Sequence, residues 1–299
     1  MPLQATEHSS NQAEALDLRA PLEVLSILHR GQLDAARCVS TCFPALCRAA
    51  EAAATALSSG GRLIYAGAGS SGLMAMADAL ELPGTFGIAP DRVVILLAGG
   101  MNNLPALAGA PEDDTDQARR DVAAAGVGPD DCIIAVSASG TTPYALAALR
   151  TARASGAATI AVANNAPAPL LDEADIAIHL STPPEIIAGS TRMGAGSAQK
   201  IALNMISTLM AIRLGHVHDG EMVNLKADNA KLKQRANRIV CAISQCTHEQ
   251  AERYLEAADG SVKVAILLAA GAPDPEQARQ MLAASAEMLR PALQHLKQS

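Results

Sequence analysis

Aromatic residues are scarce in this 299-residue chain, where they make up 2% of the sequence, and tryptophan is absent. A surface that stacks bases or sugar rings needs aromatic side chains, so the composition argues against one. The chain also lacks a basic run, and its formal net charge is −7. Nucleic acids and anionic membranes are therefore not expected as partners, and a bound anion must be held by local donors.

Metal-binding and secretory patterns are missing as well. The six cysteines form no CxxC pair and no zinc-finger spacing with histidine; they stand at positions 38, 42, 47, 132, 241 and 246. Residues 1–17 do not join a basic region to an apolar one, and the apolar stretch 201–212 is too short to cross a bilayer. We expect a cytoplasmic protein with free thiols, no signal peptide and no membrane span.

Hydrophobic residues, in contrast, make up 49% of the chain, which is enough to bury a full core. Short apolar runs alternate with stretches of helical character, and the runs predicted as strands are 63–66, 92–97, 132–136, 159–163 and 176–180. Such alternation is typical of a parallel sheet with helices on both faces. The sequence predicts an α/β fold: a three-layer α/β/α sandwich around a central five-stranded parallel sheet, with a small C-terminal all-α module.

Three parts are expected along the chain. Residues 1–20 are polar and predict an arm, residues 21–240 the α/β domain, and residues 241–299 the small helical module. Before the first strand, two or three helices are expected, with breaks at Gly31 and Pro44. Three short helices are expected in the module, because turn residues interrupt it at Gly260, Gly271 and Pro275.

A glycine-rich corner, GAGSSG, follows the first strand at residues 67–72. A helix is expected after it and should stop at Pro83. A strand, tight turn and helix in this order direct free N–H groups and the positive end of the helix dipole at one spot, which suits an anion. The candidate ligands in this corner are Gly69, Ser70 and Ser71.

The same letters match the dinucleotide fingerprint GxGxxG. A dinucleotide site also needs a carboxylate at the end of the second strand, but Gly99 and Gly100 stand there. We therefore favour a phosphate ester over NAD. A glycine turn that serves packing alone is the remaining alternative.

A second corner, SASGTT, follows the third strand at residues 137–142. It offers four hydroxyls, and capping of the helix that begins at Pro143 accounts for only one or two of them. Both corners follow parallel strands, where open α/β sheets bind ligands, and neither has the lysine of a nucleoside-triphosphate loop. The sequence predicts a monophosphate on a small metabolite, held without metal. The candidate ligands here are Ser137, Ser139, Gly140, Thr141 and Thr142.

Two carboxylates are candidates for proton transfer on a sugar. Glu81 lies among apolar residues near the end of the first helix, a context expected to raise its pKa, and Glu112 lies in the loop after the second strand. A solvated surface charge is the alternative for each. Glu81 stands about ten residues past the phosphate corner, or ~15 Å along a regular helix. It therefore reaches the substrate only if the helix leans across the pocket or a second subunit completes the site.

Further candidates are weaker. Glu185, Ser190 and Arg192 are expected to contact substrate from the segment after the fifth strand. Residues 216–219, HVHD, look like a metal cluster, but cationic residues are ordinary after a helix end. No GxSxG elbow supports Ser/His/Asp catalysis.

The motifs resemble a known family. The two corners, AGAGSSG and SASGTTP, are similar to those of sugar isomerase (SIS) domains, which bind phosphosugars. Residues 78–87, 109–114 and 189–208, and the arm from Thr6 to Asp17, resemble the N-acetylmuramic acid 6-phosphate etherases. The resemblance covers nearly the whole chain, including the small UBA-like C-terminal module.

The resemblance implies a cofactor-free lyase that cleaves the lactyl ether of N-acetylmuramic acid 6-phosphate, and a homodimer with a shared active site. Glu81 matches the acid that protonates the lactyl oxygen and later activates water. Glu112 matches the carboxylate linked to removal of the C2 proton. The positions that match phosphate ligands are Ser70, Ser137, Ser139 and Thr142.

The chain departs from the family pattern where a basic residue is usual, at Leu73, Thr141 and Gly194, and at residues 82–84, which read LPG instead of CPP. Two other functions remain open on the residues. One is a non-catalytic phosphosugar sensor, like the sugar-phosphate-binding regulator of glucokinase. The other is an aldose–ketose phosphosugar isomerase.

Overall fold

The structure is a computed structural model that describes residues 5–105, 107–225, 227 and 229–298. Its contacts divide the chain into two compact units. The first consists of Met1–Ala79 and Asp91–Ser207, and the second of Leu80–Pro90 and Thr208–Ser299. Two helices, α3 (Gly69–Phe86) and α7 (Gly194–Arg213), contribute residues to both units.

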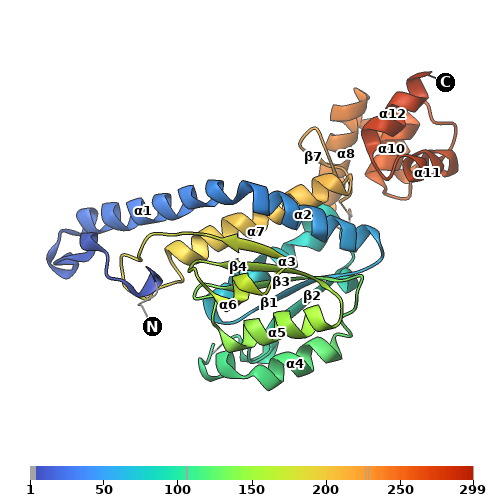
Figure 1. Cartoon of the computed structure of the whole chain (residues 1–299). Coiled ribbons are helices and arrows are strands. Elements are labelled where there is room, and N and C mark those ends of the chain that lie inside the picture. The colour runs from blue at the N-terminus through green and yellow to red at the C-terminus, as the bar shows by residue number, and fades with distance from the viewer. Residues whose placement is uncertain (1–4, 106, 226, 228, 299) are drawn as a thin grey trace. The chain divides into compact units, whose positions relative to one another are not determined.

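A five-stranded parallel sheet forms the centre of the first unit (Figure 1). Its strands are β1 (Leu63–Gly67), β2 (Val93–Leu97), β3 (Cys132–Ser137), β4 (Ala158–Ala163) and β5 (Ile176–His179), in the spatial order β2-β1-β3-β4-β5. Because β1 lies between β2 and β3, the order reverses there, and Gly67 at the end of β1 stands opposite Val136 of β3. Ligands bind at such a switch point in open α/β sheets.

Helices cover both faces of this sheet. On one face, α4 (Thr115–Ala124) and α5 (Pro143–Ala154) bury a cluster that includes Ile64 and Ile133. On the other face, α2 (Phe43–Ser58) packs against four strands. Figure 1 shows α4 and α5 on the side of the sheet opposite α2. The predicted three-layer sandwich is confirmed, and strands covered on both faces explain the continuous apolar runs.

The helices before the sheet differ from the prediction at one glycine. Helix α1 (Pro21–Cys38) runs through Gly31, so the break predicted there is wrong. A Cβ at Gly31 would lie 3.0 Å from Ile186 Cγ1, which shows that the helix packs closely at this point. Such packing offsets the ~1 kcal/mol that glycine costs inside a helix. Pro44 lies in the first turn of α2, as the predicted break requires.

Helix α3 continues beyond Pro83, where the sequence predicted its end. Proline removes one backbone donor and crowds the preceding turn, so it weakens the helix without preventing another turn. Leu82 and Phe86 are buried in this last turn and hold it in place. The helix ends at Gly87, which has a φ of +65° and donates its N–H to the Pro83 carbonyl.

The second unit contains a helical core. Its elements are the strand pair β6 (Val217–His218) and β7 (Glu221–Met222) and the helices α8 (Ala230–Ser244), α9 (His248–Ala257), α10 (Val262–Ala269), α11 (Pro275–Ala284) and α12 (Leu289–Gln298). The buried cluster of this unit extends from Val223 to Ala292. Helix α8 runs across residue 240, where a boundary was predicted, because its apolar face belongs to this cluster.

Four helices follow residue 241 instead of the three expected. The additional break separates α11 from α12, where Ala286 and Glu287 have φ values of 50° and 62°. No glycine or proline marks this turn in the sequence.

Short elements complete the chain. They are η1 (Ala5–Glu7), η2 (Asn11–Ala13), η3 (Leu16–Leu18), η4 (Val39–Cys42), η5 (Pro90–Arg92), η6 (Met101–Asn103), η7 (Ala110–Asp113) and α6 (Pro169–Asp172). In the described ranges, no helix combines the length and the apolar character that crossing a bilayer requires.

Candidate functional site

The first corner, residues 67–72, turns tightly from β1 into α3. A Cβ at Gly67 would lie 2.9 Å from the Cα of Gly72, so no side chain fits between strand and helix. Gly69 has a φ of +51°, a conformation that favours glycine. Ser70 and Ser71 occupy the first turn of α3 at the carboxyl end of β1. Backbone N–H groups in a first turn have no partner within the helix, so they are available to an anion.

The second corner, residues 137–142, gathers its four hydroxyls around one another. Ser137 Oγ accepts from the Gly140 N–H at 3.0 Å and lies 2.8 Å from Thr142 Oγ1. Ser139 Oγ accepts from the N–H and the hydroxyl of Thr141, at 3.1 and 3.0 Å. Thr142 occupies the N-cap of α5 but makes no side-chain capping bond. Capping therefore does not explain these hydroxyls, which converge beside the N-terminus of α5.

Glu112 lies against the first corner. A Cβ at Gly69 would stand 2.6 Å from Glu112 Oε1, so this carboxylate occupies the space that a side chain at Gly69 would need. Burial raises the pKa of Glu112 above its usual value, and the charge of the neighbouring Asp113 raises it further. Since β1 and β3 are neighbours, one edge of the sheet carries both corners and a carboxyl group of increased proton affinity.

Glu81 is exposed on α3 and belongs to the second unit, whereas Glu112 belongs to the first. The apolar residues near Glu81 in sequence do not enclose its side chain. Leu80 is 60% exposed, and Leu82 and Phe86 are buried. Positions i+1 and i+5 do not share the face of residue i on a helix, which is why the expected apolar surroundings of Glu81 are absent in the single chain.

Glu185 is buried and already has partners. Its carboxylate accepts hydrogen bonds from the N–H groups of Gly194 and Ala195, at 2.9 and 2.8 Å. These groups begin α7, so the carboxylate satisfies the helix end and interacts favourably with its dipole. Ser190 is half-buried and Arg192 exposed in the loop that this contact anchors.

A network that the sequence did not reveal connects the second corner to this loop. The Asn165 amide nitrogen donates to the carbonyl of Ala138 and to the hydroxyl of Thr6, both at 2.9 Å. The Thr6 carbonyl accepts from the Gly189 N–H at 3.0 Å. The only sequence signal was the pair Asn164-Asn165 at the end of a predicted strand, and it did not indicate a partner in the arm.

A second buried network joins the first strand to two helices within the first unit. The Asp78 carboxylate on α3 is 4% exposed and accepts from the Tyr65 hydroxyl at 2.6 Å. It also accepts from Asn204 Nδ2 at 2.6 Å and from the Ser207 hydroxyl at 3.0 Å, both on α7. Burial raises the pKa of Tyr65 well above its usual value, so this phenol stays a donor. Strand β1 and helices α3 and α7 are thereby joined within the first unit.

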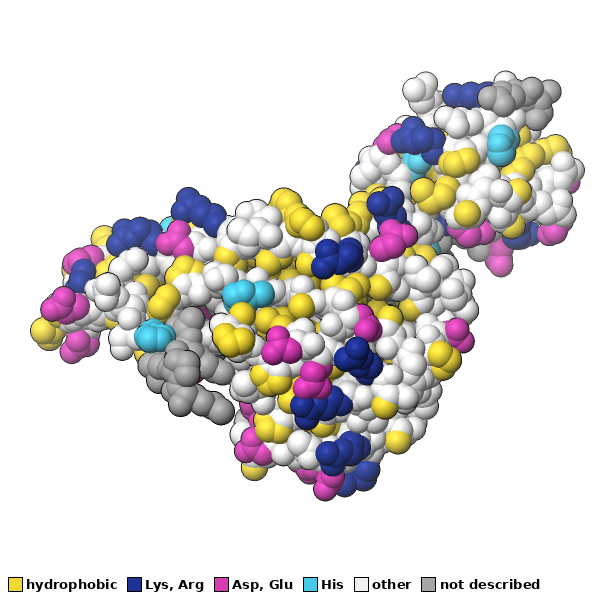
Figure 2. Space-filling view, in the orientation of Figure 1, with side chains coloured by type: hydrophobic (Ala, Val, Ile, Leu, Met, Phe, Trp, Pro, Cys, Tyr) yellow, Lys and Arg dark blue, Asp and Glu magenta, His cyan; other side chains and the backbone are white. Residues whose placement is uncertain are grey.

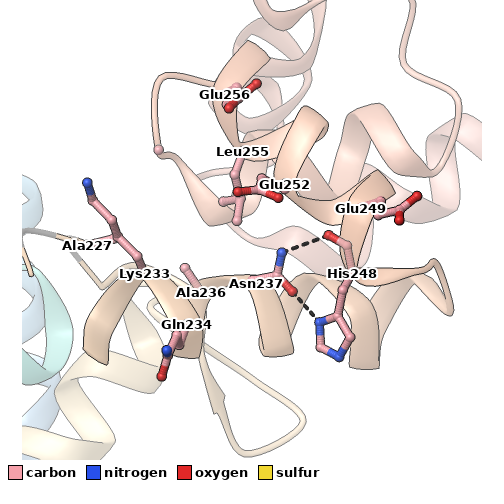
Figure 3. Close-up of a pocket in the computed structure, with 11 residues that line it drawn as sticks. Ala227, Lys233, Gln234, Ala236, Asn237, His248, Glu249, Glu252, Leu255 and Glu256 are labelled. Carbon is pink, nitrogen blue, oxygen red and sulfur yellow. Dashed lines mark hydrogen bonds between the residues drawn. The ribbon is translucent and has the colours of Figure 1, made fainter. Parts of the chain in front are cut away.

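A cavity of about 640 Å³ lies between α8 and α9 of the second unit (Figure 3). Figure 3 shows Asn237 and His248 bonded to each other at its edge. The Asn237 amide nitrogen donates to the His248 carbonyl at 2.9 Å, and the Asn237 amide oxygen lies 2.5 Å from His248 Nδ1. Glu249, Glu252 and Glu256 of α9 line it, and their charge is unsuited to a phosphate. None of the predicted site residues lines this cavity.

The HVHD segment does not form a metal site in the described part of the chain, where no group of three or more His, Cys, Asp or Glu side chains is placed to hold an ion. Burial lowers the pKa of His216 to about 4, and it lowers the pKa of His218 as well. His218 Nε2 lies 3.6 Å from Asp219 Oδ2.

Comparison with known proteins identifies the family. A family model described as SIS domain matches residues 35–164. The chain is 46% identical to the N-acetylmuramic acid 6-phosphate etherase of Deinococcus radiodurans over 253 residues, which is 85% of this chain and 83% of that one. The chain belongs to the N-acetylmuramic acid 6-phosphate etherase family. The etherase of Geobacillus thermodenitrificans is 39% identical over 290 residues, 97% of this chain and 98% of that one. The resemblance predicted from the motifs is confirmed.

A solved structure shares the fold of this etherase family member. It is the putative phosphosugar isomerase involved in capsule formation from Bacteroides fragilis, with a TM-score of 0.51. The match covers 67% of this chain and 95% of that one at 19% identity, so it shows a common fold.

Proposed function

We propose that this protein is a cofactor-free lyase that cleaves the lactyl ether of N-acetylmuramic acid 6-phosphate, giving N-acetylglucosamine 6-phosphate and D-lactate. Family membership supports the substrate, because the matched relatives carry this name over most of their length. The observation that carries the chemistry is the contact between Glu112 and the glycine of the first corner, Gly69. A half-buried carboxylate beside an anion-binding turn is suited to take a proton from a bound phosphosugar.

The two corners hold the phosphate in this proposal. The hydroxyls of the second corner converge at the start of α5, and Ser70 lies at the start of α3. Two helix N-termini supply N–H donors and favourable dipoles, so the dianion needs no metal. The contact residues are Gly69, Ser70, Ser71, Ser137, Ser139, Gly140, Thr141 and Thr142, with Ser190 and Arg192 on the loop that Glu185 anchors.

The carboxylates perform the proton transfers. In the open-chain sugar the C1 aldehyde makes the C2 proton acidic, and Glu112 removes it. The electron pair of the C2–H bond forms the C2–C3 double bond, while the C3–O bond breaks and Glu81 protonates the departing lactate oxygen. Water then adds at C3 after giving its proton to Glu81, and C2 regains a proton from Glu112.

A homodimer with a shared active site completes the proposal. Glu81 and its neighbour Leu80 are exposed in the single chain. Large apolar side chains are exposed on α1 and at the start of α2, and Figure 2 shows hydrophobic side chains among the charged ones in this region. They include Leu22, Leu25, Leu33 and Phe43. Burying these exposed apolar side chains would favour association with another subunit.

The cytoplasm is the proposed compartment. All six cysteines are free thiols, a state that a reducing environment maintains.

A D-lactate assay with N-acetylmuramic acid 6-phosphate tests the proposed reaction. Glu81→Ala removes the acid and is expected to lower turnover by about 10²- to 10⁴-fold. Glu256→Ala, which removes another exposed glutamate of the second unit, is expected to keep wild-type activity. Absence of lactate release by the wild-type protein would reject the proposal. Thermal stabilisation by sugar phosphates without product would then indicate a sensor, and interconversion of aldose and ketose 6-phosphates an isomerase.

A further inference from the structure

Thr6, in the N-terminal arm, is 1% exposed, although the arm around it is largely exposed. All its polar groups have partners. Its N–H donates to Asn165 Oδ1 at 3.2 Å, its hydroxyl accepts from Asn165 Nδ2 at 2.9 Å, and its carbonyl accepts from the Gly189 N–H at 3.0 Å. Two segments remote from the arm in sequence therefore meet at one residue.

Asn165 transmits this contact to the second corner. Its amide nitrogen carries two hydrogens, of which one goes to Thr6 and the other to the Ala138 carbonyl. Loss of the Thr6 hydroxyl leaves one of these hydrogens without its buried partner, so the amide is then held by the Thr6 N–H and the Ala138 carbonyl. The bond to Ala138 and the bonds to Thr6 therefore share one amide group, and losing the hydroxyl removes one of the three contacts that orient it.

Ala138 stands between Ser137 and Ser139, the two serines whose hydroxyls organise the second corner. Its carbonyl also accepts from the N–H of Asn164 at 3.0 Å. Two donors thus hold the carbonyl between the two serines in one orientation, and with it the backbone from which both hydroxyls project.

The other contact of Thr6 acts on the loop with Ser190 and Arg192. Gly189 has a φ of +73°, and a Cβ there would lie 3.1 Å from Glu7 Oε2. The arm thus lies directly against Gly189, so both Thr6 and Glu7 restrict the start of this loop.

We propose that Thr6 is a positioning residue for the phosphosugar site. Through Asn165 it orients the second corner, and through Gly189 it holds the start of the loop with Ser190 and Arg192. The inference rests on the proposed function for the identity of the ligand, a sugar monophosphate. Its effect belongs to substrate binding. The loops are ordered before the substrate arrives, so the cost of ordering them is not taken from the binding energy.

Steady-state kinetics of the full chain with N-acetylmuramic acid 6-phosphate test this role. Thr6→Val keeps the shape of the side chain and removes its hydroxyl, and it is expected to raise KM about three- to tenfold with kcat changed less than twofold. Thr6→Ser keeps the hydroxyl and is expected to restore KM. Ser10→Ala is the matched control, because the Ser10 hydroxyl in the same arm accepts from the nearby Gln12 N–H and, within the described residues, makes no hydrogen bond to Asn165 or Gly189.

An unchanged KM in Thr6→Val, or a loss of kcat at constant KM, would overturn the inference. Thr6→Ala gives a second variant if the valine protein does not fold, since it adds no methyl group. The effect of the substitution on the second corner is also measured without substrate, as the rate of amide hydrogen exchange at residues 138–142. Faster exchange in the variant than in the wild type supports the inference, and equal exchange overturns it.

The exchange measurement separates the two proposals. If the wild-type protein releases no lactate, the proposed reaction fails. The arm inference is then decided by exchange and by the concentration of N-acetylglucosamine 6-phosphate that stabilises each protein thermally. A midpoint shifted upward about three- to tenfold in Thr6→Val supports it, and an identical midpoint rejects it.

Discussion

At the scale of single residues, proton affinity distinguishes Glu112 from an ordinary surface glutamate. Burial and the Asp113 charge both raise its pKa. A base must be ionised to act, so the acidic limb of the kcat/KM profile is expected at higher pH than for an exposed glutamate. Because the folded pKa is raised, stability associated with Glu112 is greatest at low pH and is lost as pH rises through the folded pKa.

Asp113→Asn tests this assignment. It removes the adjacent negative charge, so the pKa of Glu112 falls and the acidic limb of kcat/KM moves to lower pH. The profile of D-lactate release against pH measures the shift. Asp116→Asn is the control, because Asp116 pairs with Arg119 and is not among the groups that raise the pKa of Glu112. An acidic limb that stays in place in Asp113→Asn would show that another group controls it.

At the scale of elements, the start of α7 shows how a helix end and a site loop depend on each other. The Glu185 carboxylate accepts hydrogen bonds from two N–H groups there. Removal of the carboxylate leaves both N–H groups without partners inside the protein. Hydrogen bonds to a charged group contribute about 1.5–3 kcal/mol each. The loop with Ser190 and Arg192 is held between this contact and the arm.

Glu185→Gln is therefore expected to lower the free energy of unfolding by about 1.5–3 kcal/mol, since the amide offers one acceptor and places a donor against the other N–H. Urea unfolding measures the loss. Asp114→Asn at the N-cap of α4 is the control, where asparagine caps as well as aspartate and little change is expected. A stable Glu185→Gln protein with a raised KM would instead indicate that Glu185 contacts the substrate directly.

The same scale shows how far local signals predict elements. Five apolar runs bounded by turn residues identified all five strands of the main sheet, and both hydroxyl corners lie where the strands end. The helix ends predicted at Gly31 and Pro83 are wrong, because a residue that weakens a helix ends it only where packing does not compensate. Both lie in helices whose buried side chains hold the turn together.

At the scale of the whole molecule, the proposed dimer accounts for apolar surface that the single chain leaves exposed. Leu25→Glu places a charge where a side chain is 61% exposed, and the protein is expected to become mainly monomeric and to lose most of its lactate release. Light scattering coupled to size exclusion measures the mass. Thr55→Glu is the control, since it adds the same charge to an exposed position of α2 without removing apolar area. A monomeric wild-type protein with full activity would contradict the shared site.

By itself, the sequence determined the sheet, the two hydroxyl-rich corners and the family, because each depends on residues close together in the chain. Only the tertiary structure decided which partners the site residues have. Asn165 meets Thr6 across a separation of 159 residues, and Glu112 lies against Gly69 of the first corner. Glu81 is exposed although its sequence neighbours are apolar. Contacts of this kind form when the folded chain brings distant segments together, and no local window of residues specifies them.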